Sequence, residues 1–466
     1  MSERLSADAV VIGSGVAGMT AAVRLAAAGR CVIVVEEAPR LGGRATAFTD
    51  RDTAERVDNG QHALFGCYRE TYALLDLLGT REMAPLQPQL ALTMADEGGR
   101  AWELRCPNLT PPWHLIAGLM RWGAIGWSDR WSATRLRGVI ADVRSRGAEA
   151  VAADVPPGLT VSAWLRANGQ TKRLCDWLWH PLAIAALNQH PDVAAAAPFV
   201  RVLGELFGPG PQDAAIGLPL APLDELYAEP ARRFVEARGG RVIAKASARV
   251  MLDANGGATG VRAGALEIDA PVVISTVAWH AFGRLWEAAP PPAIASIAAR
   301  AAEMASSPIV TVNLWLDGPP LRSAFTGFVG GPMHWVFDKR ALFGDRADHL
   351  SIVASGADEL AGMDNAAITR AALDQLVHAL PDLISRKVQR SVVVREPRAT
   401  FSLAPGQPQR PPTATGMPGL FLAGDWTDTG LPGTIEGAAV SGKRAADAAL
   451  GFRSPSSPGT PAAPAH

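Results

Sequence analysis

The first forty residues alternate between short apolar runs and glycine-rich turns. Ala9 to Ile12 is a continuous apolar run rich in β-branched residues, which predicts a buried parallel strand. The turn Gly13-Ser14-Gly15-Val16-Ala17-Gly18 follows at once, and Met19 to Ala28 is typical of a helix of small residues. A second apolar run, Cys31 to Val35, ends at Glu36. The pattern predicts a strand, turn, helix and strand unit that binds a dinucleotide.

The residues of this turn have separate expected roles. Gly13 makes the tight turn, Gly15 lets the backbone approach a pyrophosphate, and Gly18 lets the helix pack close to the sheet. The helix N-terminus offers backbone N–H groups to the phosphates, so Ser14 and Ala17 are included among the cofactor contacts. Glu36, eighteen residues after Gly18, is placed to bind ribose hydroxyls, with Glu37 beside it.

Later apolar and polar patterns divide the rest of the chain. Between about residues 85 and 221, prolines, tryptophans and arginines replace the nucleotide-binding pattern, which predicts a mainly helical insert. A helix is predicted from Pro222 to Arg238, ending at Gly239-Gly240, and short strands follow from residue 241 to 276. Residues 308–317 and 325–338 are predicted strands and residues 364–380 a predicted helix. The Ser-, Pro- and Ala-rich residues 452–466 predict a disordered tail.

Composition and charge restrict the function classes. The chain of 466 residues has a formal net charge of −1, which gives no reason to expect a nucleic-acid partner. Cys31, Cys67, Cys106 and Cys175 lack CxxC spacing, so neither a metal site nor a disulfide framework is indicated. Met1 to Asp8 is too short and polar for a signal peptide, and no apolar run reaches 18 residues. We therefore expect a cytoplasmic protein that does not span the membrane.

A second motif favours FAD over NAD. Arg40-Leu-Gly42-Gly43-Arg44 begins four residues after Glu36. The paired glycines allow the backbone to lie against the flavin side of the cofactor, and Arg44 can neutralise pyrophosphate charge. The arrangement resembles the extended FAD-binding signature of the amine oxidase and phytoene desaturase superfamily.

The C-terminal region carries a matching motif. Gly419 to Asp425 predicts a strand ending in Gly424-Asp425, and a helix is predicted from Thr434. The resemblance to the superfamily implies that Asp425 binds the ribitol or neighbouring hydroxyls, and that Thr434, Ile435 and Glu436 lie at the flavin edge where negative charge grows on reduction. It also implies that the backbone of Val250 contacts adenine. FAD should be non-covalently bound, because no cysteine lies in this region.

Two further segments resemble the hydroxysqualene dehydroxylases of bacterial hopanoid biosynthesis, within that superfamily. In the first, Asp58-Asn59-Gly60-Gln61-His62, the resemblance places the loop near the flavin ring. Gln61 and His62 would then meet flavin or substrate, although capping a turn is an equal alternative. The second is Trp179-His180-Pro181-Leu182, followed by Leu187-Asn188. Together with Trp177 and Phe199, its residues are candidates for an apolar substrate tunnel, with core packing as the alternative.

The resemblance implies an α/β fold: a Rossmann-type FAD-binding domain of the amine-oxidase type with an inserted α+β substrate domain. The FAD-binding domain is expected to comprise residues 1–84, 222–290 and 413–451. The substrate domain is expected to comprise a mainly helical part, 85–221, and a sheet part, 291–412.

The resemblance also implies a reaction in which hydroxysqualene loses its allylic hydroxyl, accepts hydride from reduced flavin and becomes squalene. A proton donor must reach the hydroxyl. The candidates are His62, His180 and Asp428, with Gln61 beside the first, and His62 is preferred because its loop is expected near the flavin. Electrons must come from an external donor or reductase, because only one dinucleotide fingerprint is present.

Three alternative functions remain open. A carotenoid-type desaturase would carry the same cofactor motifs, although the Asp58 to His62 segment and the chain length favour the dehydroxylase. A flavin amine oxidase would need an aromatic cage, which three tyrosines make hard to build. A flavin-bound lipid carrier would show no redox change with substrate.

The segment from Pro111 to Trp131 is a candidate membrane contact. It holds four of the thirteen tryptophans, with Arg121 and Arg130 beside them. Such residues suit a water–lipid interface, whereas packing in the domain core is the alternative.

Overall fold

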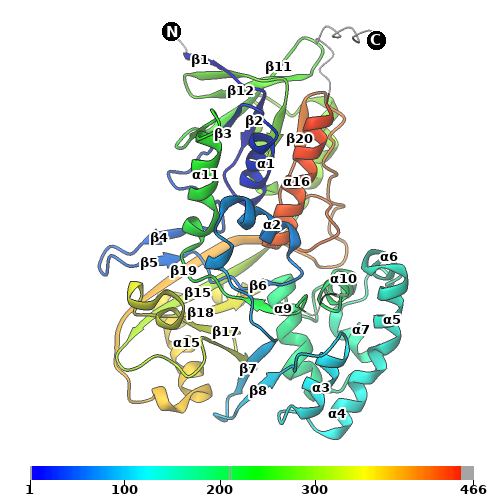
Figure 1. Cartoon of the computed structure of the whole chain (residues 1–466), viewed down its shortest axis with the longest axis vertical. Coiled ribbons are helices and arrows are strands. Elements are labelled where there is room, and N and C mark those ends of the chain that lie inside the picture. Colours follow the sequence, from blue (N-terminus) through cyan, green and yellow to red (C-terminus); the bar gives the residue numbers. More distant parts are fainter. Residues whose placement is uncertain (1–2, 209, 211, 453–466) are drawn as a thin grey trace, which may run out of the picture.

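The computed structural model describes residues 3–208, 210 and 212–452, so the predicted tail from residue 453 onward lies outside the described residues. The molecule is elongated, with the first strand and the C-terminal end of the last helix at one end of it and two lobes, one mainly sheet and one helical, at the other (Figure 1). Among the described residues, no helix combines the length and apolar character needed to cross a bilayer.

A five-stranded parallel sheet is the centre of the part of the molecule that lies opposite the two lobes (Figure 1). Its order is β10-β3-β2-β14-β20. The strands are β10 (Arg241–Ile243), β3 (Val32–Val35), β2 (Ala9–Ile12), β14 (Val273–Ser275) and β20 (Leu420–Leu422). Parallel pairing sets Val273 opposite both Val10 and Leu420, so segments from three distant parts of the sequence meet in one sheet. The inner strands are buried on both faces, which is why they are continuous apolar runs.

Helices cover one face of this sheet (Figure 1). They are α1 (Val16–Ala27), α11 (Glu229–Glu236) and α16 (Ile435–Gly451), and α2 (Arg69–Leu78) packs on α11 and α16. α1 and α16 pack closely because Gly442 has no side chain: a Cβ there would lie 2.3 Å from the Ala17 carbonyl oxygen. The first and last helices of the fold are thereby held together beside the nucleotide-binding turn.

The opposite face is covered by a second sheet and two helices. The strand order of this second sheet is β1-β13-β12-β11. Its strands are β1 (Glu3–Ser6), β13 (Leu266–Asp269), β12 (Ala258–Ala263) and β11 (Ala248–Leu252). The helices are η5 (Trp279–Leu285) and α12 (Pro292–Glu303). We expected residues from 291 onward in the substrate domain, but Ile294 and Ile297 of α12 belong to the core beneath the nucleotide sheet.

A seven-stranded sheet forms one of the two lobes. Its order is β19-β15-β18-β17-β16-β7-β8. The strands are β19 (Val388–Phe401), β15 (Ser306–Leu316), β18 (Leu350–Ser355), β17 (Trp335–Asp338), β16 (Phe325–Val329), β7 (Ala91–Asp96) and β8 (Ala101–Arg105). α15 (Asn365–Ala379) packs on one face. Residues 91–105, which we expected in a mainly helical segment, form two of these strands, and the alternation in Ala91 to Asp96 was too weak to predict them.

The helical lobe lies beside this sheet (Figure 1). Its helices are α3 (Trp113–Arg121), α4 (Trp127–Ala133), α5 (Arg137–Arg146), α6 (Ala148–Ala153), α7 (Val161–Ala167), α8 (Lys172–Leu174), α9 (His180–Leu187) and α10 (Ala196–Leu206). A π-helical turn, η3 (Cys175–Trp179), precedes α9, and Pro181 occupies the first turn of α9. Proline is tolerated there because the first N–H groups of a helix have no partner within it.

The partly buried His334, between β16 and β17, makes unfolding depend on pH. Its Nδ1 accepts the Ser355 N–H at 3.0 Å, and burial lowers the pKa of His334 to about 4. Below its unfolded pKa of about 6.5, the unfolded chain binds a proton that the folded chain does not, so stability falls as the pH decreases. We expect His334→Gln to remove a loss of about 1–2 kcal/mol between about pH 7 and pH 5, measured by urea unfolding. Equal losses in the variant and the wild type would contradict this assignment.

Candidate active site

A cleft opens at the carboxyl ends of the parallel strands, where dinucleotides bind in open α/β sheets. Its volume is about 380 Å³. Residues that follow four different strands line it: Gly13 after β2, Glu36 after β3, Thr276 after β14 and Gly424 after β20. The predicted cofactor contacts that line it are Gly13, Ser14, Gly15, Ala17, Glu36, Glu37, Gly42, Gly43, Arg44, Gly424, Asp425, Thr434 and Ile435. The structure therefore gathers both ends of the chain around one cleft.

Glycines at the cleft allow two kinds of close approach. Gly13 has a φ of +105°, a conformation that side chains rarely adopt. Gly18 does not line the cleft; a Cβ on it would lie 2.0 Å from the Gly13 carbonyl oxygen, so it permits α1 to meet the turn. Gly15 has open space where its Cβ would be, and the Cβ of a side chain at Gly43 would lie 3.2 Å from the Gly15 Cα. The two glycines leave bare backbone facing the cleft.

The carboxylate of Glu36 is held by the turn itself. It accepts hydrogen bonds from the Ser14 N–H and hydroxyl, both at 2.7 Å, and from the Ala38 N–H at 2.8 Å. These contacts fix a negative charge at the end of β3, on the cleft wall.

Arg44 and Asp425 join the two chain ends across the cleft. The Arg44 guanidinium donates to the Asp425 carboxylate and, at 2.7 Å, to the Ala399 carbonyl oxygen. It also lies over the Trp279 ring, 5.4 Å from its centre. The contact places residues from the N-terminal and the C-terminal motif of the sequence in one wall, although the pairing itself was not expected.

The N-terminus of α16 faces the cleft, but Glu436 does not. Thr434 caps the helix by accepting the Gly437 N–H at 3.0 Å. The buried Glu436 carboxylate instead accepts the Glu70 and Thr71 N–H groups at 2.9 Å each, and so caps α2. Burial raises the pKa of Glu436. The Glu436 side chain therefore has a structural role, because the helix turns it toward α2, while the predicted contact of the helix N–H groups with the flavin stays a prediction.

Other predicted cofactor residues lie outside the cleft lining. Arg40 is exposed over the Phe48 ring, and the Val250 side chain is in the core beneath the sheet, while its neighbour Arg249 lines the cleft. The Asn59 amide donates to the Arg44 carbonyl oxygen at 3.3 Å, and Gly60 packs near Thr311. Asn59 and Gly60 thus support the wall from behind.

The loop that follows β5 (Arg56–Asp58) brings one candidate acid–base group to the cleft. His62 lines it, and the Nδ1 of His62 lies 2.8 Å from the Gly60 carbonyl oxygen. In the tautomer that donates this bond, Nε2 is free to meet a ligand. Burial lowers the pKa of His62.

Behind His62 lies an ion pair that the sequence did not predict. Lys339 and Asp58 are almost fully buried, with 1% and 3% of their side chains exposed, and the Lys339 Nζ lies 2.7 Å from the Asp58 carboxylate. Nζ also donates to the Gln61 side-chain oxygen and lies over the Phe343 ring. Gln61 is thus bound to Lys339 rather than to the cleft. Burial lowers the pKa of Lys339, and Asp58 opposes that change.

The remaining acid–base candidates are not in the cleft lining. His180 lies on α9 with its Nδ1 3.8 Å from Asp176, and Asp428 is exposed beside Arg410. Neither residue lines the cleft, and neither lines the second cavity described below. His180 is next to Trp179 and Pro181 in the sequence, but the fold does not place it in the cofactor cleft.

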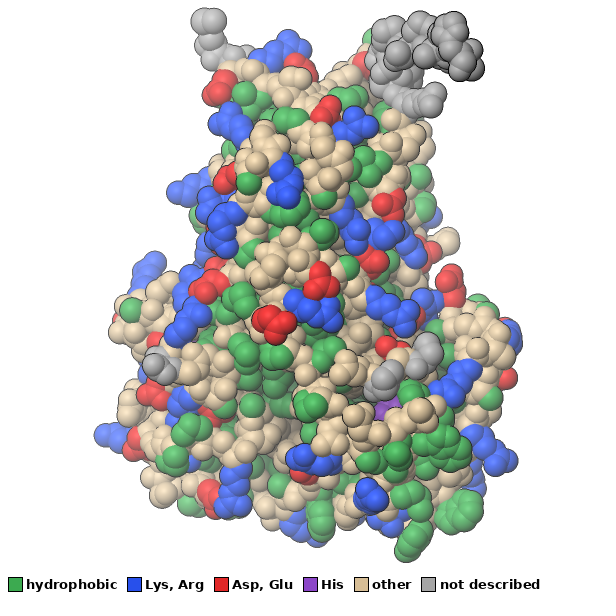
Figure 2. Space-filling view, viewed as in Figure 1, with side chains coloured by type: hydrophobic (Ala, Val, Ile, Leu, Met, Phe, Trp, Pro, Cys, Tyr) green, Lys and Arg blue, Asp and Glu red, His purple; other side chains and the backbone are tan. Residues whose placement is uncertain are grey.

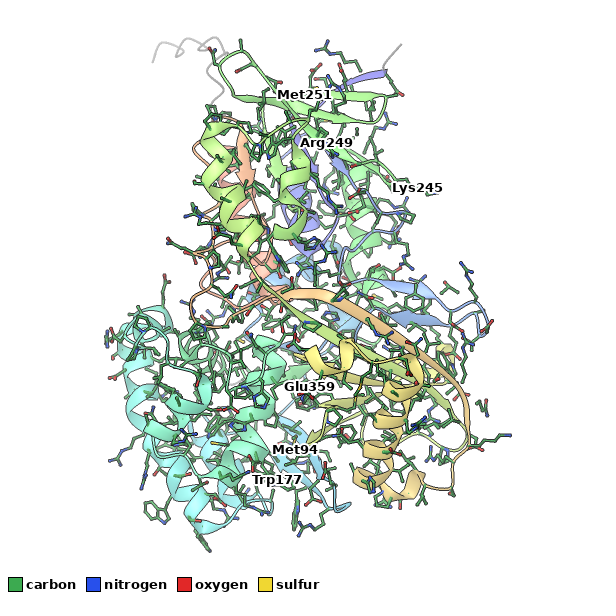
Figure 3. All side chains as sticks on the ribbon, turned by 180° about the vertical axis from the view of Figure 1, so that it is seen from behind. Met94, Trp177, Lys245, Arg249, Met251 and Glu359 are labelled. Atoms are coloured by element: carbon green, nitrogen blue, oxygen red, sulfur yellow. The ribbon has the colours of Figure 1, made fainter. Side chains whose placement is uncertain are left out.

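The expected tunnel residues are packed or tied elsewhere. Trp177, Trp179 and Phe199 are buried in the core of the helical lobe. Figure 3 shows Trp177 in that lobe, far from Arg249 on the cleft wall. The Asn188 amide donates to the Ser307 carbonyl oxygen and the Thr400 hydroxyl, each at 3.0 Å. Asn188 therefore ties α9 to the seven-stranded sheet, and none of the four residues lines either cavity.

Several cleft residues were missed in the sequence. His280, Arg284 and Arg249 line the cleft, and burial together with nearby arginines lowers the pKa of His280 to about 4. His280 and Arg284 follow the carboxyl end of β14. They could have been predicted, because the loops that follow parallel strands gather at one edge of the sheet, where the cofactor binds.

A second cavity of about 290 Å³ adjoins the cleft, because Thr434 lines both. It lies between α10 and α16, and its apolar lining includes Phe65, Leu206, Leu431 and Pro432. Arg201 and Glu205 are also in its wall and pair with each other at 2.9 Å.

Two family models match the chain. The model described as flavin containing amine oxidoreductase matches residues 202–450, and the model described as NAD(P)-binding Rossmann-like domain matches residues 11–78. The first covers more than half of the chain, and the second covers the glycine-rich turn, the end of β2 before it and the whole of β3 after it. The two matches include both walls of the cleft.

Individual relatives extend over nearly the whole chain. The hydroxysqualene dehydroxylase of Rhodopseudomonas palustris is 30% identical over 443 residues, which cover 94% of this chain and 97% of that protein. The 15-cis-phytoene desaturase of Narcissus pseudonarcissus is 23% identical over 94% of this chain and 78% of that protein. An oxidoreductase from Methanosarcina mazei has a similar fold, with a TM-score of 0.72, 18% identity, and coverage of 95% of this chain and 100% of that one.

Proposed function

The chain belongs to the family of flavin-containing amine oxidoreductases, and we propose that within it this enzyme is a hydroxysqualene dehydroxylase. The observation that carries the proposal is the 30% identity to such an enzyme across 94% of this chain and 97% of that one. The reaction is the reductive removal of the allylic hydroxyl of hydroxysqualene as water, with hydride addition at carbon, giving squalene. It balances when two electrons and two protons enter from an external donor.

The cleft suits a non-covalent FAD. Glu36 offers a carboxylate to ribose hydroxyls, the bare backbone at Gly15 accommodates a pyrophosphate, and the N-terminus of α16 faces the flavin end. No cysteine is among the cleft-lining residues described. Reduced flavin supplies the hydride. Acid precipitation of the holoprotein should therefore leave all the flavin in the supernatant.

The second cavity offers the isoprenoid a way to the flavin edge. It adjoins the cofactor cleft at Thr434, and apolar side chains in its wall alternate with charged ones such as Arg201, Glu205 and Glu436. A long hydrocarbon chain gains free energy from leaving water for such a surface.

We expect His62 to carry the proton for the leaving hydroxyl. Burial lowers the pKa of His62 below the ordinary histidine value of about 6.5. The fraction of His62 in the imidazolium form, which donates the proton, therefore increases as the pH falls below that value. In the wild type, kcat should therefore rise toward acid pH and level off below the lowered pKa. His62→Gln should lower kcat by about 100-fold and remove this acid rise, while the flavin content stays unchanged. A His180→Gln variant, altered outside both cavities, is the matched control. An unchanged pH profile in His62→Gln would exclude His62 as the donor.

The reaction itself is tested under anaerobic conditions. The enzyme is reduced with dithionite, freed of excess reductant and mixed with hydroxysqualene. We expect the absorbance of oxidised flavin to return while one squalene forms for each flavin reoxidised. Reduction of the oxidised flavin by phytoene, with no reaction of hydroxysqualene, would instead assign the enzyme to the desaturases related to it.

A further inference from the structure

The end of the helical lobe carries an exposed apolar surface on two neighbouring helices. On α3, Trp113, Ile116 and Met120 are exposed, at spacings of three and four residues that set them on one helix face. On α4, Trp127 and Trp131 are exposed at a spacing of four residues. We call these five residues, together with the exposed Leu109, the tryptophan surface.

This surface is unusual because its tryptophans are turned outward. The exposed fractions of Trp113, Trp127 and Trp131 are 61%, 65% and 71%. Trp122, from the same segment, is only 1% exposed and packs in the lobe core. Monomeric proteins rarely expose a contiguous apolar patch that has no partner. The helices already have an inner face for the core, so the outer face is available for an external contact.

Basic residues accompany the tryptophan surface along the chain. Between residues 113 and 146 the chain has six arginines, at 121, 130, 135, 137, 144 and 146, and two aspartates, at 129 and 142, a difference of +4. Arg146 also pairs with Asp154, which lies just beyond this stretch, at 2.6 Å. Asp129 is buried, so it adds little to the outer charge. The Arg130 guanidinium lies over the Trp127 ring, 4.9 Å from its centre. Figure 2 shows apolar side chains gathered at this end of the molecule with basic ones beside them.

We propose that the tryptophan surface docks the enzyme on the face of an anionic lipid bilayer. Indole rings favour the headgroup region because they combine an apolar body with an N–H, and arginines gain from anionic headgroups while their stems cover apolar area. A protein partner would not require this positive excess, which favours the membrane as the occupant. The surface is argued from its own residues; its use in collecting a water-insoluble substrate rests on the proposed function.

The test is vesicle co-flotation of the full-length holoprotein. The probes are vesicles of equal parts phosphatidylglycerol and phosphatidylcholine, and vesicles of phosphatidylcholine alone. The wild type should float with the anionic vesicles, and more weakly in high salt. The triple variant Trp113→Ser/Trp127→Ser/Trp131→Ser should lose about tenfold or more in lipid partitioning, and Arg121→Glu/Arg137→Glu should lose the preference for anionic lipid.

The matched control is Met363→Ser/Ile384→Ser, which removes two exposed apolar residues of the sheet lobe and should leave flotation unchanged. Flavin absorbance and circular dichroism establish that each variant is folded. No flotation of the wild type, or equal flotation of wild type and triple variant, would overturn the proposal. So would self-association of the wild type that the triple variant abolishes without any lipid binding. Because flotation needs no substrate, it can succeed even if hydroxysqualene is not turned over.

Discussion

Lys339→Met is expected to lower the free energy of unfolding by about 3–5 kcal/mol, because it leaves a buried carboxylate without its counter-charge. The Asp58 side chain is 3% exposed. Without Lys339, its carboxylate would keep one of its present donors, the Leu223 N–H at 3.1 Å. The side-chain oxygen of Gln61 would also lose the Lys339 donor. Urea unfolding of wild type and variant at neutral pH measures the difference.

Two further variants separate the ion pair from a general effect of losing a lysine. Lys172→Met removes an exposed partner of Asp176, 2.6 Å away, and should cost less than about 1 kcal/mol. Asp58→Asn/Lys339→Met removes both buried charges and should recover part of the loss. If Lys339→Met cost no more than Lys172→Met, the burial of this pair would not contribute to stability.

The second large effect is expected when either of two glycines of the same turn is replaced by alanine. One replacement should weaken cofactor binding, and the other should lower stability. In Gly15→Ala the added methyl meets open space, so the chain should fold normally. That space is where a pyrophosphate would approach, and the affinity for FAD should fall by about 100-fold, equivalent to about 2.7 kcal/mol. In Gly18→Ala the methyl lies 2.0 Å from the Gly13 carbonyl oxygen, so α1 must move and stability should fall by about 1–3 kcal/mol.

Flavin titration and thermal unfolding of the flavin-free protein measure the two effects separately. Gly138→Ala in α5, where a Cβ meets nothing within 4 Å, is the control and should change neither quantity adversely. A Gly15→Ala variant with wild-type FAD affinity would show that the cofactor does not approach this turn.

The cofactor unit was predictable because its constraints act between residues close in sequence. The run from Ala9 to Ile12, the spacing of Gly13, Gly15 and Gly18, and the second run ending before Glu36 each depend on local backbone geometry. The same holds for Thr434 as the cap of α16. Resemblance to known families extended this to the second motif and to the overall arrangement.

Side-chain roles at the site depended on partners that are distant in sequence. Nothing near Glu436 indicates that its carboxylate caps α2, because Glu70 and Thr71 lie more than 360 residues away. Lys339 is likewise 281 residues from Asp58, and neither residue type predicts burial. A polar residue in a motif can therefore face the cofactor or support the fold, and its neighbours in space determine which.

By itself, then, the sequence determined that this protein has a dinucleotide-binding unit at one end of the chain and a matching strand and helix at the other, because short-range steric rules govern both. Only the tertiary structure decided which tryptophans are core and which are surface. Trp177 and Trp179 are buried whereas Trp127 and Trp131 are exposed, although all four belong to similar helical patterns. Burial is set by how whole elements pack against one another, and that depends on contacts between segments far apart along the chain.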